Sequence, residues 1–287
     1  METDTFSNNT ASSLLTSSHW TQWRRWAELY PTTFYDIFAN LEPAIAETEQ
    51  RSATHITYAA EATEPLFVLL SKLPWAKSFF ETIGAGSTAM APGLLADYPW
   101  HELLPGPVCD LGGGNGEFLF TILDRFSEMT GAVLELEDST ALRSAVQNFN
   151  SETGKFSSVN SRLIDVHSGN FLREVPSYPF YTIRWTLHNW GDDETVQILK
   201  NVRTAILKSE QRQGRRLLVV EAVVKPNEVL SRPAMYGSLV MMSGAKNGKE
   251  RSEREWQELC QRSGWRIHRV FDLRNCIPNI LDLRPVE

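Results

Sequence analysis

Val108-Cys-Asp-Leu-Gly-Gly-Gly-Asn-Gly116 carries the most information in the chain, because four strand-like residues lead directly into a cluster of glycines. The spacing of an amphipathic helix follows at 117–126. A tight strand-to-helix turn lets a ligand approach the backbone at the helix N-terminus. A dinucleotide fingerprint would need glycine in place of Glu117, and the Gly-Lys-Ser/Thr of a P-loop is absent. The loop therefore predicts a nucleoside ligand without a phosphate, with Asp110 placed to pair with an ammonium group.

Strand-like and helix-like segments alternate from this loop onward. Strands are expected at 107–111, 132–137, 161–166, 180–187, 217–224 and 265–273. Helices are expected at 117–126, 140–149 and 192–207, and a further helix begins at the capping box of Ser252 and Glu255 and ends at Gly264. This alternation predicts a Rossmann-like α/β fold with a doubly wound, mostly parallel sheet.

The first hundred residues have a different character. Residues 1–19 are rich in Ser, Thr and Asn and lack the features of a signal peptide, which favours a disordered lead-in. Residues 20–100 have apolar residues at helical spacing interrupted by prolines, which predicts a region of short helices. Trp20, Trp23 and Trp26 would share one helical face, which favours packing on another helix or a second chain over membrane binding. We therefore expect three units, at 1–19, 20–100 and 101–287.

The composition is that of an ordinary globular protein. Of the 287 residues 42% are apolar, and 28 basic residues against 35 acidic ones give a net charge of −7. A net acidic chain argues against a nucleic-acid partner, and without a run of about 20 apolar residues no membrane-spanning helix is expected. Three scattered cysteines favour a reduced, cytoplasmic location. None of the six histidines has the spacing of a metal site, so no metal is expected.

Two clusters follow the second and fourth predicted strands. Glu135, about 20 residues after the glycines, stands where an acid binds ribose hydroxyls in nucleoside-binding α/β folds. Arg184-Trp-Thr-Leu-His-Asn-Trp190 lies at the end of the fourth strand, where open α/β sheets bind their ligands. A neutral imidazole at His188 is suited to take a proton from a phenol or an acid. A lone histidine between tryptophans is nevertheless more often structural.

Six motifs occur in a fixed order along the chain, namely DLGGGNG, LELE, SGNF, RWTLHNW, VVEAVV and GKERSEREW. In this order they resemble the small-molecule O-methyltransferases that depend on S-adenosylmethionine, the class I type that includes plant caffeic-acid enzymes and many fungal natural-product enzymes. The likeness runs from about Thr54 to near the C-terminus. It implies a methyltransferase domain, S-adenosylmethionine as cofactor, and methyl transfer to a phenolic or enolic small molecule of secondary metabolism.

The resemblance also implies which residues hold the cofactor. The family uses the glycine loop, the acid after the second strand, an acid with an apolar neighbour near the adenine, and a lysine before the histidine. The matching positions here are Asp110, Gly112, Gly114, Gly116, Glu135, Asn170, Phe171 and Arg184. Asn170 departs from the usual Asp, so it lacks the charge but can still accept a hydrogen bond from the adenine amino group.

On the acceptor side the resemblance implies a general base with two orienting acids, and a pocket of aromatic and methionine side chains. These positions are His188, Glu221, Glu250, Trp185, Met241 and Met242. Without the resemblance, Glu221 would be a strand-end acid and Glu250 a solvated charge. The implied chemistry is an in-line transfer in which the protein positions the acceptor oxygen and removes its proton. The alternative is a protein that keeps the cofactor pocket but catalyses a pericyclic or dehydrating step, or only binds a ligand.

Relatives of this type usually carry a winged-helix dimerisation domain, and the part of this chain before Thr54 is too short for a full copy. We therefore expect the usual dimer to be altered or lost, with the helices of residues 20–100 providing the contacts of any homodimer. The expected partners are a small aromatic substrate and a second copy of the chain, with no nucleic acid and no membrane. The particular acceptor stays open, because aromatic and methionine side chains suit any flat ring.

Overall fold

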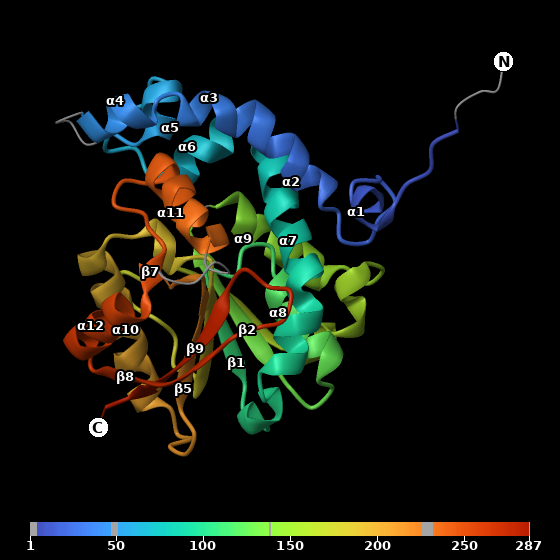
Figure 1. The fold of residues 1–287 in the computed structure, drawn as a ribbon. Helices are drawn as coiled ribbons and strands as arrows, with labels where there is room; N and C mark the ends of the chain where they lie inside the picture. The colour runs from blue at the N-terminus through green and yellow to red at the C-terminus, as the bar shows by residue number, and fades with distance from the viewer. Residues whose placement is uncertain (1–4, 47–50, 138, 226–231, 287) are drawn as a thin grey trace.

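The computed structural model describes residues 5–46, 51–137, 139–225 and 232–286. Its central sheet contains β1 (Val108–Leu111), β2 (Gly131–Leu136), β3 (Leu163–Gly169), β4 (Phe180–Arg184), β5 (Arg216–Glu221), β8 (Trp265–Phe271) and β9 (Asn279–Pro285). The strands lie in the order β3-β2-β1-β4-β5-β9-β8. The first five are parallel, and β9 is antiparallel to β5 and β8. The predicted doubly wound, mostly parallel sheet is confirmed (Figure 1).

The strand order reverses at β1, which has β2 on one side and β4 on the other. Asp110 is in register with Val133 of β2 and Thr182 of β4, so these strands end next to one another. At such a reversal the connections leave in opposite directions and open a crevice outside the carboxyl ends of the strands. The glycine loop after β1 and the turn after β4 therefore border the same crevice.

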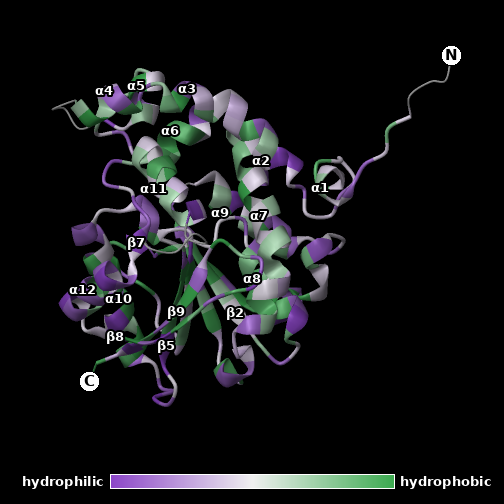
Figure 2. Cartoon of the chain, viewed as in Figure 1, coloured by the Kyte–Doolittle hydropathy of each residue, from purple (hydrophilic) through white to green (hydrophobic). Residues whose placement is uncertain are grey.

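Helices cover both faces of the sheet. In β5, Leu217 and Val219 belong to one hydrophobic core, and Leu218 and Val220 belong to another. The first core is closed by α10 (Asp192–Lys208) and α12 (Glu253–Ser263), and the second by α7 (Ala76–Asp97), α8 (Glu117–Arg125) and α9 (Thr140–Asn150). Figure 2 shows hydrophobic strands beneath helices such as α10 and α12 that present many hydrophilic residues. Burial on both faces explains the unbroken apolar run of β5.

A further group of helices lies above one end of the sheet (Figure 1). It consists of α2 (Arg24–Leu29), α3 (Tyr35–Phe38), α4 (Leu41–Ala46), α5 (Ala53–Thr57), α6 (Leu66–Lys72) and α11 (Arg232–Gly244). Leu29, Phe34, Ile37 and Ala53 form its small core. The expected helical N-terminal region is confirmed, and α11 joins it from the C-terminal half of the chain.

The N-terminal region differs from the expectations in detail. The prediction that three tryptophans share one helical face is wrong, because α2 begins only at Arg24 and Trp20 is 57% exposed. A helical turn, α1 (Thr10–Ser13), lies within the expected lead-in, where Asn9 and Ser12 form a capping box. Among the described residues, no helix is both long and apolar enough to cross a membrane.

The C-terminal half differs from the expectations in four places. β4 stops at Arg184 rather than at 187, because the chain turns at Trp185, whose φ is +48°, into the 3-10 turn η5 (Leu187–Asn189). The run 217–224 is interrupted at Ala222, and β6 (Val223–Val224) pairs with β7 (Arg251–Ser252) instead of the main sheet. Neither β9 nor α11 was expected.

Candidate active site

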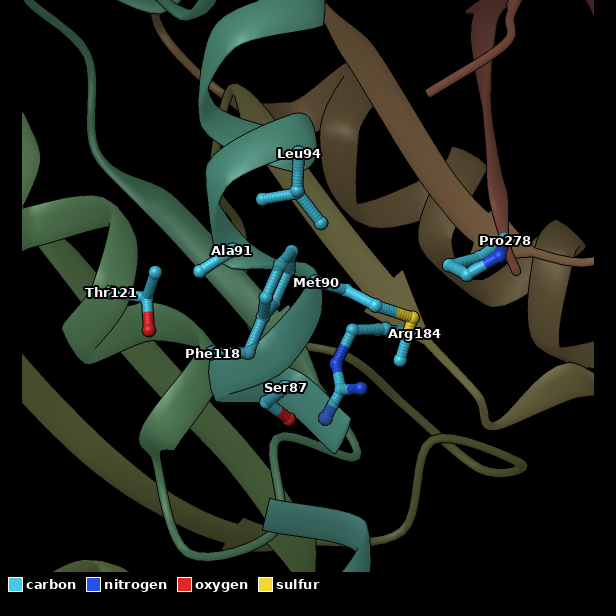
Figure 3. Close-up of a pocket in the computed structure, with 8 residues that line it drawn as sticks. All are labelled: Ser87, Met90, Ala91, Leu94, Phe118, Thr121, Arg184 and Pro278. Atoms are coloured by element: carbon cyan, nitrogen blue, oxygen red, sulfur yellow. The ribbon is translucent and has the colours of Figure 1, made fainter. Parts of the chain in front are cut away.

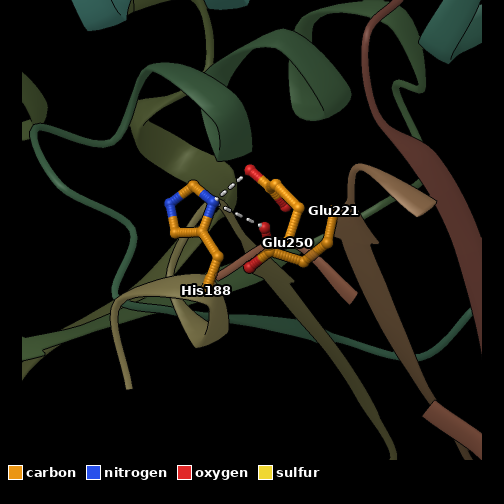
Figure 4. Close-up of side chains that lie close together, drawn as sticks. All are labelled: His188, Glu221 and Glu250. Atoms are coloured by element: carbon orange, nitrogen blue, oxygen red, sulfur yellow. Dashed lines mark hydrogen bonds and ion pairs between the residues drawn. The ribbon is translucent and has the colours of Figure 1, made fainter. Parts of the chain in front are cut away.

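His188, Glu221 and Glu250 converge at the carboxyl end of the sheet. The Nδ1 atom of His188 lies 2.9 Å from Oε1 of Glu250 and 3.2 Å from Oε2 of Glu221. Figure 4 shows both contacts on the same ring nitrogen, while the other nitrogen points away from the carboxylates. All three side chains are buried. The two acids therefore hold the imidazole with Nδ1 protonated and leave Nε2 free for another partner.

Backbone contacts fix this arrangement. Oε1 of Glu221, at the end of β5, accepts the N–H groups of Thr186 at 2.8 Å and Leu187 at 2.9 Å, which positions the turn that carries His188. The N–H of Lys249 donates to the carbonyl of His188 at 2.9 Å. The buried guanidinium of Arg251 donates to the carbonyl of Leu187 at 3.1 Å. The turn is thus held from β5 and from the segment that carries Glu250.

The environment makes His188 a strong base. Burial alone lowers the pKa of His188, but the carboxylates of Glu221 and Glu250 outweigh that effect and raise the pKa to about 9. Burial raises the pKa of Glu221, and the nearby His188 offsets this only in part. The titrations of His188 and Glu221 are therefore linked.

The same three side chains bring one ligand atom each within 4.8 Å of one another, a geometry that can hold a cation. Histidine spacing along the chain cannot reveal this cluster, because its acids come from distant segments. The 2.9 Å separation of Nδ1 of His188 and Oε1 of Glu250 is that of a direct hydrogen bond between the two side chains.

Asp110 is the second unusual charge in the crevice. Its side chain is 1% exposed, and Oδ1 accepts a 2.7 Å hydrogen bond from Oγ1 of Thr182, while the buried Oδ2 has no partner. Burial raises the pKa of Asp110 to about 7, although the hydrogen bond from Thr182 and the charge of Arg184 oppose the shift. A buried carboxylate oxygen without a donor is costly, so it fits a site that receives a cationic ligand group.

Each glycine of the loop occupies its position for a different structural reason. Gly112 has φ +64°, and an added Cβ would lie 2.8 Å from Oγ1 of Thr186. Gly114, with φ +62°, donates its N–H to Oε2 of Glu135 at 2.8 Å. Gly116 begins α8 with φ +88°. Positive φ favours glycine, and the loop, the acid after β2 and the turn after β4 are thereby brought together.

Asn170 and Phe171 lie between β3 and β4, and both make contacts within the protein. Oδ1 of Asn170 accepts the N–H of Leu172 at 2.9 Å. Phe171 is 2% exposed and packs edge-to-face on Trp190, with ring centroids 5.9 Å apart. The amide of Asn170 keeps hydrogen-bonding capacity for a ligand, whereas Phe171 belongs to the main core.

Arg184 and Trp185 lie at the end of β4. The guanidinium of Arg184 lies 4.7 Å from the ring centroid of Trp185 and 5.3 Å from that of Phe118, and its buried Nε has no partner. Arg184 also lines a cavity of about 10 Å³ between α7 and α8 (Figure 3), together with Ser87 and Met90. This volume is that of about one water molecule.

Met241 and Met242 lie on α11, where Met241 is half-buried and Met242 is 39% exposed. Two neighbours on α11 that the sequence analysis did not single out contact Glu250. Oγ of Ser238 accepts the N–H of Glu250 at 3.1 Å, and a Cβ on Gly237 would lie 3.3 Å from Cγ of Glu250.

Taken together, the fold and the site define a class, namely Rossmann-like α/β proteins in which a nucleoside-type glycine loop faces an imidazole held by two carboxylates. The model of the O-methyltransferase domain family matches residues 67–266. The chain belongs to this family.

Several fungal relatives are similar over nearly the whole chain. It is 40% identical over 281 residues to the O-methyltransferase sirM of Leptosphaeria maculans, which covers 98% of this chain and 66% of the relative. It is 39% identical over 283 residues to the O-methyltransferase gliM of Aspergillus fumigatus, covering 99% of this chain and 64% of the relative. The chain thus spans about two thirds of the length of the curated relatives it matches.

Solved structures share the fold at low sequence identity. Human N-acetylserotonin methyltransferase in complex with SAM superimposes with a TM-score of 0.80 at 20% identity, over 98% of this chain and 75% of that chain. The mitomycin 7-O-methyltransferase MmcR gives a TM-score of 0.79 at 22% identity, over 98% and 77% of the two chains. These likenesses confirm the class I methyltransferase fold that the motifs predicted.

Proposed function

We propose that this chain is an S-adenosylmethionine-dependent O-methyltransferase that acts on a phenolic or enolic small molecule in secondary metabolism. The observation that carries the proposal is the orientation of His188, whose Nδ1 is held by Glu221 and Glu250 while Nε2 stays free. Family membership and the names of the fungal relatives support the same activity.

The residues around the glycine loop fit the cofactor. The unpartnered Oδ2 of Asp110 provides an acceptor for the ammonium group of its amino-acid part. Glu135, although it already accepts two backbone N–H groups, retains lone pairs for ribose hydroxyls. An added Cβ at Gly114 would have nothing within 4 Å, so the backbone there leaves room for a close approach of the ligand. The amide of Asn170 is the candidate contact to the adenine. Arg184 is the remaining candidate residue for cofactor binding.

When bound, the cofactor supplies a methyl group on a sulfonium centre that is already a good leaving group. The protein then has to orient the acceptor and to take its proton. Nε2 of His188 takes the proton from the acceptor hydroxyl, and Glu221 and Glu250 stabilise the resulting imidazolium. A pKa of about 9 keeps His188 protonated at neutral pH in the free protein. The positive charge of the cofactor, held in the same crevice, would lower this pKa, so that a larger fraction of His188 is neutral and able to accept a proton.

The proposed acceptor is a flat aromatic ring. Trp185 supplies an aromatic wall beside the turn of His188, and Met241 on α11 is a candidate for the opposite side. A solved neighbour with a TM-score of 0.75, the O-methyltransferase NcsB1, was crystallised with 1,4-dihydroxy-2-naphthoic acid. Such ring systems are the first acceptors to test.

Transfer of a labelled methyl group from S-adenosylmethionine tests the proposal. Purified protein is incubated with catechol, caffeic acid and 1,4-dihydroxy-2-naphthoic acid, and the label in the organic product is counted. We expect methylation of at least one phenol and a higher melting temperature with S-adenosylhomocysteine. Stabilisation by S-adenosylhomocysteine without methylation of any phenol would favour the alternative, a binding or non-methylating protein.

Association through the helical region is also proposed. Exposed apolar side chains occur on α3, α4 and α11, with Tyr35 69%, Ile45 66% and Tyr236 67% exposed. Such a surface favours a second copy of the chain. Light scattering on the full chain and on a form without residues 1–30 tests whether the N-terminal segment contributes, because an unchanged mass would exclude it. The unpaired Cys109, Cys260 and Cys276 support a reducing location such as the cytoplasm.

A further inference from the structure

Trp26 of α2 carries a polar group that its surroundings do not satisfy. Its Nε1–H is inaccessible to solvent and has no hydrogen-bond partner. Nearly all buried donors in folded proteins are paired, so each exception needs an explanation. The ring stacks on Tyr30 with centroids 6.1 Å apart and meets Trp185 edge-to-face at 6.3 Å. The donor therefore lies among aromatic side chains next to the turn that carries His188.

A glycine in α7 makes room for the two tryptophans. A Cβ on Gly86 would lie 3.1 Å from Cζ2 of Trp26 and 3.2 Å from Cη2 of Trp185, which is tighter than an ordinary contact. Glycine is unfavourable inside a helix compared with alanine. Gly84, one of its neighbours in α7, has nothing within 4 Å of an added Cβ. Contact with the rings of Trp26 and Trp185 therefore explains the glycine at position 86 but not the one at position 84.

Trp185 is held in an unusual conformation at this contact. It has φ +48°, a conformation that is rare for a bulky side chain and that recurs at functional sites. The guanidinium of Arg184 lies 4.7 Å from its ring centroid. Because Trp185 is only three residues before His188, the Trp26 contact lies close to the turn that carries the proposed base.

We propose that Trp26 is a specificity-determining residue of the acceptor pocket. Its ring and that of Trp185 form an aromatic wall for a flat substrate, and its Nε1–H donates to an oxygen of that substrate other than the one methylated. This inference rests on the proposed function and adds to it a substrate class, namely planar rings with at least two oxygen substituents. The unpaired indole N–H gains its partner when such a ring is bound.

Kinetics of paired variants test the proposal on the phenol that the wild type methylates best. Trp26→Phe keeps an aromatic ring and removes the donor, so we expect KM for that phenol to rise about threefold to tenfold, with kcat and S-adenosylhomocysteine binding nearly unchanged. Trp20→Phe, at a tryptophan that is 57% exposed, is the matched control and leaves KM unchanged. Gly86→Ala raises KM by displacing the ring pair, whereas Gly84→Ala does not. A Trp26→Phe enzyme with the wild-type KM would overturn the proposal.

A readout without turnover separates this inference from the proposed function. Protein with ¹⁵N-labelled indoles is titrated with 1,4-dihydroxy-2-naphthoic acid in the presence of S-adenosylhomocysteine, and the Trp26 signal is identified by its absence in Trp26→Phe. We expect that signal to move downfield while the signal of the exposed Trp20 stays in place. A moved signal without methyl transfer refutes the activity but supports the contact. An unmoved Trp26 signal refutes the contact, whatever the activity.

Discussion

Gly112 and Thr186 touch across the crevice, since a Cβ on Gly112 would lie 2.8 Å from Oγ1 of Thr186. Thr186 also donates its N–H to Glu221, whose other oxygen faces His188 at 3.2 Å. The loop proposed to hold the cofactor and the imidazole proposed as base are therefore linked by direct contacts. Such contact favours precise placement of an electrophile against an acceptor oxygen.

His188→Ala is expected to remove turnover while leaving cofactor binding intact. The side chain supplies the only proposed base, and general base catalysis contributes about 10²–10⁴-fold. The measurement is kcat with labelled S-adenosylmethionine, together with the affinity for S-adenosylhomocysteine by calorimetry. An alanine variant that keeps most of its rate would exclude His188 as the base.

The rate should rise with pH because His188 acts in its neutral form. The pKa of about 9 in the free protein is lowered when the cofactor binds, so kcat/KM for the phenol at saturating cofactor increases with pH and levels off above the pKa of His188 in the cofactor complex. Glu250→Gln removes a negative charge next to Nδ1, so the pKa of His188 falls and the rise occurs at lower pH. Ionisation of the phenol itself would not respond to this substitution. An inflection at the same pH in both proteins would contradict the assignment.

Cofactor affinity should depend on the ionisation of Asp110. Burial raises its pKa to about 7, and only the carboxylate pairs well with an ammonium group. Between pH 6 and pH 8 the ionised fraction rises about tenfold, so S-adenosylhomocysteine should bind about tenfold more tightly at pH 8. Asp110→Asn should bind weakly at both values. Equal pH dependence in the two proteins would show that another group controls binding.

Local signals in the sequence were sufficient for much of the fold. The glycines between β1 and α8 and the capping box of Ser252 and Glu255 specify turns through residues only a few positions apart, and both are present in the structure. Gly264 ends α12 in the left-handed conformation, as expected. A continuous apolar run marked β5 because both faces of the sheet are buried.

The features that the sequence did not predict depend on contacts between residues far apart in the chain. β9 lies between β5 and β8, and this placement depends on pairing with residues about 60 positions away in β5. Glu250 reaches His188 because β7 pairs with β6 and Ser238 holds its backbone. Phe171, which the resemblance places near the adenine, packs on Trp190 in the main core. No pattern in the neighbouring residues signals these contacts.

Two glycines of the loop should differ in how far alanine destabilises the fold. Gly114 and Gly116 both have positive φ, which costs about 1–2 kcal/mol for alanine. Only at Gly116 would the new Cβ also collide, 2.3 Å from Cε2 of the buried Phe149. Overpacking of this kind adds about 1–3 kcal/mol, so urea unfolding should rank Gly116→Ala well below Gly114→Ala in stability. Removing the collision with Gly116→Ala/Phe149→Leu should recover part of the loss relative to Phe149→Leu alone. Equal unfolding free energies for the two single variants would mean that backbone strain, and not the packing of α8 on α9, makes these positions glycine.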